Sequence, residues 1–231
     1  MNISSARGAA IAAPAPVRWV QLLIGIVCMV MIANLQYGWT VFVTPIDQKY
    51  HWGRATIQVA FTIFVLTETW LVPVEGWLVD HFGPKIVVLV GGILVGLGWT
   101  INSVAAELWA LYLAAAIGGI GAGAVYGSSI GNALKWFPDR RGLAAGLTAA
   151  GFGAGSALTI IPIQGMIQAR GYEATFLWFG IAAVIGGHSQ SLRFGHDVSF
   201  GRRSTFACLR RLLLGTLARV VGRVFERHGS S

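Results

Sequence analysis

The sequence predicts an all-α polytopic membrane protein, a bundle of six transmembrane helices. Hydrophobic residues make up 55% of the 231 residues and charged residues only 11%, whereas soluble globular chains carry about 25% charged residues. Six apolar runs are separated by short polar segments, and the 31 glycines suit close helix packing in lipid. A chain with so few charges cannot cover a soluble surface, so we expect it to lie in a lipid bilayer.

The first three apolar runs are Trp19–Val43, Ile57–Val79 and Ile86–Ala106. At 1.5 Å per residue, each is long enough as a helix to cross about 30 Å of hydrocarbon. The next two runs, Leu108–Leu134 and Gly142–Gln168, meet the same criterion.

The sixth run, Ala174–Gly187, is short for a membrane span. Two interpretations stay open. Either the helix continues through the polar stretch His188-Ser189-Gln190-Ser191, or the span is defective.

The distribution of Lys and Arg between alternate turns predicts the orientation of the chain. With both termini in the cytoplasm, six basic residues before residue 188 lie inside and three lie outside, as the positive-inside rule requires. The inside group is Arg7, Arg18, Lys85, Lys135, Arg140 and Arg141, and the outside group is Lys49, Arg54 and Arg170.

The two ends of the chain differ from the apolar middle. Residues 1–17 are rich in Ala, Pro and Ser, and we expect them to be disordered in the cytoplasm. Residues 188–231 carry eight Arg against one Asp and one Glu. This tail predicts either a basic amphipathic helix on an anionic membrane surface or a non-native end, such as a shifted reading frame. The abrupt change of composition favours the second interpretation.

The stretch GWLVDHFGPK, residues 76–85, is a charged turn between two apolar runs. Its Gly76, Asp80, Gly83 and Lys85 fall on the G-x-x-x-D-x-x-G-x-[KR] signature of the major facilitator superfamily, with His81 where that family usually has Arg. The chain therefore resembles the N-terminal six-helix half of that twelve-helix fold, over residues 18–187. The resemblance implies that Asp80 is a gating residue, with partners among Lys85, Arg140 and Arg141.

A second stretch, KWFPDRRGLA at residues 135–144, is a basic turn in which Pro138 ends one helix and Asp139 caps the next. It resembles the loop between helices four and five of the oxalate/formate antiporter and monocarboxylate transporter branch.

The string NLQYGWT, residues 34–40, resembles the first helix of the oxalate/formate antiporters. The resemblance implies that Gln36 and Tyr37 donate hydrogen bonds to substrate oxygens, with Gln58 and Tyr126 on the same cavity wall and Trp39 either shaping the cavity or packing. The alternative for each polar residue is a hydrogen bond between helices.

Glu68 and Glu75 are carboxylates inside the second apolar run. We expect Glu75 to be hydrated or paired near the turn and Glu68 to lie deeper, where burial favours the neutral form. Proton coupling is not favoured, because proton-coupled relatives often carry an Arg in helix four and residues 113–116 have none.

Two glycine pairs, Gly119 with Gly123 and Gly151 with Gly155, have the G-x-x-x-G spacing of helix-packing faces. A nucleotide site would need a preceding strand, which the pattern does not predict. Cys28 and Cys208 lack metal-ligand spacing. We therefore expect no enzyme, no metal and no cofactor.

The resemblance to these families implies secondary active transport of small organic anions by alternating access, of the oxalate/formate or monocarboxylate exchange type, and we expect the chain to be a truncated transporter. We expect the bacterial inner membrane, with a second half-transporter or a second copy as partner and no nucleic acid. No Lys or Arg lies in mid-span, so the alternative is a non-transporting remnant or a partner-binding half with a lipid-contacting tail.

Overall fold

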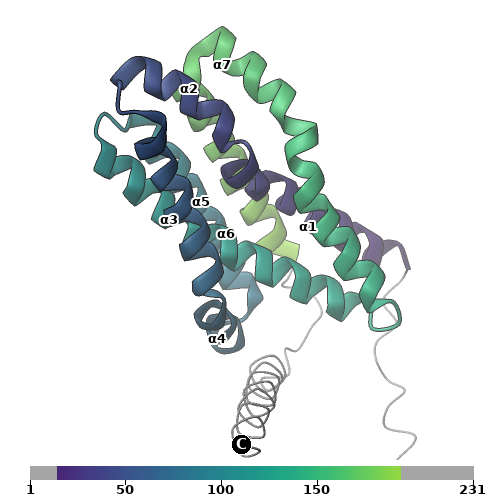
Figure 1. Cartoon of the computed structure of the whole chain (residues 1–231). Helices are drawn as coiled ribbons and strands as arrows, with labels where there is room; N and C mark the ends of the chain where they lie inside the picture. The colour runs from purple at the N-terminus through teal and green to yellow at the C-terminus, as the bar shows by residue number, and fades with distance from the viewer. Residues whose placement is uncertain (1–14, 194–231) are drawn as a thin grey trace, which may run out of the picture.

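The computed structural model describes residues 15–193, and all of its secondary structure in this range is α-helical. The predictions for the extreme N-terminus and for the Arg-rich tail fall mostly on residues 1–14 and 194–231, outside the described range. The helices are α1 (Ala15–Tyr37), α2 (Trp39–Tyr50), α3 (Arg54–Trp70), α4 (Val72–Phe82), α5 (Pro84–Val104), α6 (Leu108–Trp136) and α7 (Arg141–Arg193) (Figure 1).

The first crossing of the bundle is broken where the sequence predicts one continuous run. The break is at Gly38, between α1 and α2, and a Cβ at this position would lie 2.6 Å from the carbonyl oxygen of Asn34. Pro45 inside α2 removes a further backbone donor. This crossing therefore has a less regular helix than its hydropathy indicates.

The second crossing is also broken, because α3 and α4 meet at a bend of 50°. Pro73 occupies the first turn of α4, where its missing N–H costs no helical hydrogen bond. The chain then turns sharply at Gly83, whose φ of 82° is readily adopted only by glycine.

The last long helix, α7, is kinked at Gly171 (φ 83°, ψ 164°) into two antiparallel segments. The returning segment continues through residues 188–191 to Arg193, which confirms the first alternative for the sixth span. Gln190 is buried there and its Nε2 donates to the hydroxyl of Ser129 on α6 at 2.9 Å. The helix therefore extends into the bundle beyond the predicted boundary at Gly187.

Length and apolarity identify four single candidate spans among the described residues, or five with the bent α3–α4 pair. One of the four is α7, which at 1.5 Å per residue is far too long for a single crossing. Because α7 reverses at Gly171, it supplies two crossings. The six-helix membrane bundle predicted from the sequence is confirmed.

Glycines allow the helices of the bundle to pack closely. On α6, a Cβ at Gly121 would lie 2.6 Å from the carbonyl oxygen of Gly91 on α5, and on α7 a Cβ at Gly187 would lie 2.8 Å from the Cα of Gly92. The predicted packing faces are confirmed: Gly119 and Gly123 contact α3 and α4, and Gly151 and Gly155 contact α1.

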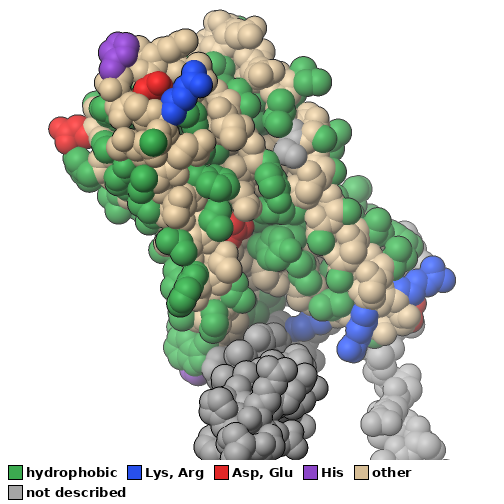
Figure 2. Space-filling model, viewed as in Figure 1, with side chains coloured by type: hydrophobic (Ala, Val, Ile, Leu, Met, Phe, Trp, Pro, Cys, Tyr) green, Lys and Arg blue, Asp and Glu red, His purple; other side chains and the backbone are tan. Residues whose placement is uncertain are grey.

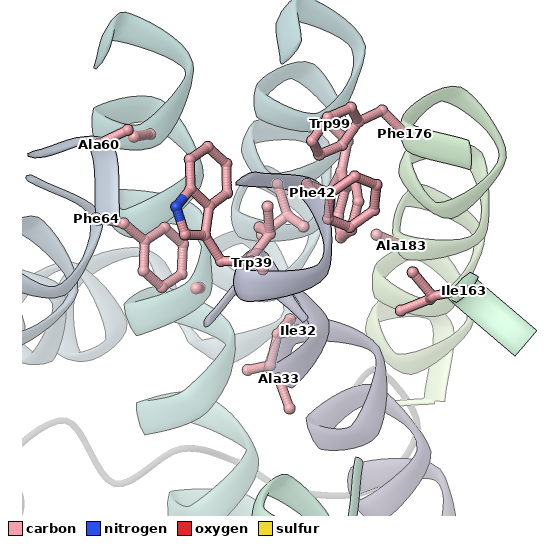
Figure 3. Packing of buried hydrophobic residues seen from close by; sticks show 14 of the residues in the cluster. Ile32, Ala33, Trp39, Phe42, Ala60, Phe64, Trp99, Ile163, Phe176 and Ala183 are labelled. Atoms are coloured by element: carbon pink, nitrogen blue, oxygen red, sulfur yellow. The ribbon is translucent and has the colours of Figure 1, made fainter. Parts of the chain in front are cut away.

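A cluster of aromatic rings fills the core between α2, α5 and α7. Phe42 stacks on Phe176 with ring centroids 4.1 Å apart, and Trp99 packs edge-to-face on Phe42 at 5.8 Å (Figure 3). Trp39 is buried on the α3 side of this core and packs instead of facing a cavity. Outside the core, hydrophobic side chains cover much of the visible surface between charged ends, as a lipid environment requires (Figure 2).

Candidate functional site

Two of the four predicted substrate-binding residues lie against the same aromatic ring. Tyr37 at the end of α1 and Tyr126 on α6 both pack edge-to-face on Phe152 of α7, with centroids 5.5 Å and 5.2 Å away. Phe152 is buried, Tyr126 is half-buried and Tyr37 is 42% exposed. Three helices thus meet at one aromatic cluster that presents a phenol to the bundle surface.

The other two predicted residues stand apart from this aromatic cluster. Gln36 directly precedes Tyr37 on α1, and Gln58 lies in the second turn of α3. Both side chains are half-buried. The structure records no contact that joins Gln58 to the tyrosines.

Asn34 fixes the end of α1 against α7 beside the aromatic cluster. The Thr159 hydroxyl donates to the Oδ1 of Asn34, and Asn34 is fully buried with no hydrogen-bond partner at its Nδ2. This polar contact lies three residues before Tyr37, next to the break at Gly38. It holds the broken end of α1 where the cluster forms.

The wall around Tyr37 and Tyr126 carries no positive side chain. Within residues 15–193, every Lys and Arg lies near a helix end, in a turn or beside the kink of α7. Hydrogen-bond donors are present, but a buried dianion also needs cations. The described residues can therefore supply only part of a site for such a ligand.

Asp80, the centre of the first motif, lies in the last turn of α4. It is half-buried, and the cation that attracts it across the bundle is Lys135 in the last turn of α6. Lys135 belongs to the second motif, so the structure brings the two motifs together at one end of the bundle, which we call the motif end.

The remaining motif residues surround this contact. Gly83 forms the turn between α4 and α5. No atom of a neighbouring element lies within 4 Å of the position that a Cβ at Gly76 would take. The side chains of Lys85, Arg140 and Arg141 are more exposed than that of Asp80. Their assignment as partners of Asp80 stays a prediction.

The motif end also contains an ion pair. Arg18 on α1 pairs with Asp139 in the α6–α7 turn, and its Nε donates to the carbonyl oxygen of Trp136 at 2.6 Å. The hydrogen bond from Arg18 holds the pKa of the Asp139 carboxyl below its ordinary value. At the opposite end of the bundle, Lys49 pairs with Glu173.

Residues 22–192 match the family model of the Major Facilitator Superfamily. The chain belongs to this superfamily. The match covers all six crossings and confirms the membership predicted from the motifs at residues 76–85 and 135–144.

Several relatives that the chain resembles are longer than it is. The oxalate:formate antiporter of Oxalobacter formigenes is 38% identical over 71% of this chain and 39% of its own length. The uncharacterized MFS-type transporter YhjX of Escherichia coli is 29% identical over 73% of this chain and 42% of its own. Human monocarboxylate transporter 11 is 34% identical over 47% of this chain and 23% of its own. The chain spans less than half of each relative.

Sequence reasoning missed Phe152, Lys135 as the cation facing Asp80, and the pairing of Arg18 with Asp139. Phe152 is the only aromatic residue between Gly142 and Gly171, and this isolation among small residues was the available signal. The two charge contacts join residues more than fifty positions apart. No local pattern indicates such pairs.

Proposed function

We propose that the chain is one half of a secondary active transporter for small organic anions, in which Tyr37, Tyr126, Gln36 and Gln58 form one wall of the substrate site. The observation that carries the proposal is the aromatic cluster, because it brings tyrosines from two helices against one ring, with Tyr37 exposed at the bundle surface. The names of the antiporter and the monocarboxylate transporter support a carboxylate substrate.

The motif end is proposed as the gate and as the cytoplasmic side. The basic residues Arg18, Lys85, Lys135, Arg140 and Arg141 all lie at this end, as the positive-inside rule requires of the inner face. Asp80 and Lys135 join α4 to α6, and Arg18 and Asp139 join α1 to the α6–α7 turn. Alternating access requires these contacts to break when the bundle opens to this side. We further propose the bacterial inner membrane as the location.

Counterflow of oxalate and formate in proteoliposomes tests the proposal. We would reconstitute the chain with the part of the O. formigenes antiporter that it does not match, because that part is expected to supply the missing cations. Saturable exchange is expected, lost in Tyr37→Ala and strongly reduced in Asp80→Asn. Glu107→Gln, at an exposed helix start remote from both regions, is the matched control.

Failure of exchange in a folded, co-assembled preparation would contradict the proposal. So would exchange that is insensitive to Tyr37→Ala, because the aromatic cluster would then not form the site.

A second candidate is a non-transporting half that binds a partner half. The lack of Lys and Arg in the described interior favours it, since a homodimer would repeat the same uncharged wall. Exchange by the chain alone would exclude this candidate. Assembly with the complementary half without any exchange would support it.

A further inference from the structure

Glu75 is a buried carboxyl group between α4 and α6. Its side chain is 6% exposed, and it is the buried residue through which α4 meets the bundle. Its Oε1 is enclosed and has no hydrogen-bond partner. The sequence predicts a hydrated or paired Glu75 near the turn, but the structure buries this residue beside the bend between α3 and α4. Glu68, which the sequence places deeper in the span, is half-buried.

Gly123 on α6 makes the space that the carboxyl group occupies. A Cβ at this position would lie 2.6 Å from Oε1 and 2.8 Å from Oε2 of Glu75, and 2.9 Å from the carbonyl oxygen of Glu68. Both carboxyl oxygens therefore lie directly against a helix backbone. The carboxyl group of Glu75 is therefore closely packed in the space that Gly123 leaves open.

Among the described residues, no positive group neutralises this carboxyl group. Few charged or titratable residues lie on the helices that pack against α4. Of these, Glu68 is the one whose charge interacts with Glu75. Lys135 is attracted to Asp80, Arg54 begins α3 far from the bend, and Lys85 begins α5. The others are Tyr112 and Tyr126 on α6 and Asp80 and His81 on α4 itself.

An ionised carboxylate in such a place has lost its water and gained no partner, which is strongly unfavourable. A bound proton removes this charge and leaves a group that fits against Gly123. We propose that Glu75, with Glu68 beside it, is a proton-binding site between α4 and α6. A hydronium ion in the surrounding water supplies the proton: one of its O–H bonds breaks as an O–H bond to a carboxylate oxygen of Glu75 forms, and a water molecule is left.

Labelling with dicyclohexylcarbodiimide tests the site without any need for transport. This apolar reagent takes the proton of a carboxylic acid before it forms an adduct, so it reports protonated carboxyl groups within the membrane. On the purified full chain at neutral pH, we expect peptide mapping by mass spectrometry to place the adduct on Glu75. Above the titration midpoint, labelling should fall about tenfold per pH unit.

Glu75→Gln should abolish labelling, and Glu107→Gln, at an exposed acidic residue, should leave it unchanged. The infrared C=O stretch of a protonated carboxylic acid should also be present in the unmodified chain and missing in Glu75→Gln. If that variant does not fold, the mapped adduct on the unmodified chain decides the question.

Three results would overturn the proposal. Absence of both the adduct on Glu75 and the infrared C=O band that Glu75→Gln removes would show that the group is ionised. An adduct on Glu68 alone would place the proton elsewhere. Protection by sodium chloride but not by choline chloride would indicate a metal-cation site. None of these depends on whether the chain transports an anion.

Discussion

Glycines on two faces of α6 have different kinds of neighbour. Toward α5, a Cβ at Gly121 would lie against the backbone of Gly91 and Val95, and a Cβ at Gly98 on α5 would lie against the backbone of Gly118. Toward α3 and α4, Gly123 lies against the carboxyl group of Glu75. The first face meets mainly backbone atoms at these positions, whereas the closest contact of Gly123 on the second face is a side chain that can rotate, followed by the carbonyl oxygen of Glu68 at 2.9 Å. We therefore expect the first to be a fixed seam and the second to be adjustable.

The largest effect is expected for Gly121→Ala. The new Cβ would lie 2.6 Å from the carbonyl oxygen of Gly91 and 2.7 Å from the backbone nitrogen of Val95, so α5 and α6 must separate. We expect a loss of about 3 kcal/mol in the free energy of unfolding, measured by circular dichroism during titration of mixed micelles with dodecyl sulfate.

Gly127→Ala on the same helix is the matched control for this substitution. No neighbouring atom lies within 4 Å of the position that the new methyl group would take, so the stability should stay the same or rise by at most about 1 kcal/mol. Equal losses at both positions would show that the α5–α6 seam has no special role.

Gly123→Ala should cost less, about 1.5 kcal/mol, because the Glu75 side chain can rotate away from the new methyl group. The double variant with Glu75→Ala should be more stable than the sum of the two single losses predicts, since the clash with the carboxyl group is then absent and only the contact with the Glu68 carbonyl oxygen remains. The same denaturation assay gives all three values. Strictly additive losses would contradict the contact between these residues.

Thr159→Val should have a smaller effect, because it removes one hydroxyl that bonds Asn34 and the carbonyl oxygen of Gly155. Hydrogen bonds between membrane helices are worth about 1 kcal/mol or less. Thr100→Val is the control, as its hydroxyl bonds its own helix at Gly96. A loss no greater than in that control would show that the contact with Asn34 does not hold α1.

The smallest effect is expected at the motif end, for Asp139→Asn. Because Arg18 lowers the pKa of Asp139, the pair stabilises the fold above the ordinary pKa of an Asp carboxyl and loses this effect as the pH falls through the lowered value. The difference in thermal stability from the unmodified chain should therefore be present at neutral pH and vanish in acid. Salt should also weaken it, since Asp139 is exposed. A difference independent of pH would contradict an ionic origin.

The sequence predicted those features that depend on local composition. Hydropathy located the crossings, and the spacing of Gly76, Asp80, Gly83 and Lys85 identified the family. The breaks at Gly38 and Leu71 were not predicted, because both lie within single apolar runs of the sequence, and hydropathy does not report a change in helix direction. Pro45 and Pro73 were the available indications of these breaks.

The candidate site was predicted only in part. Tyr37 and Tyr126 were found from the motif and from their place in the spans, but Phe152, which brings them together, belongs to a third helix. The burial of Glu75 depends on the 50° bend between α3 and α4, and a uniform helix would have placed it differently. Contacts between distant helices depend on the three-dimensional packing, which a one-dimensional pattern does not contain.

The returning segment of α7 has a consequence for how the protein is made. Gly180 and Gly187 of this segment pack against Gly96 and Gly92 on α5, yet α5 leaves the ribosome long before they do. During synthesis, the face of α5 that later contacts α7 is therefore not yet covered by its partner helix. Insertion factors or lipid must cover that face of α5 until α7 is complete. The nascent chain is therefore most prone to misassembly during this interval.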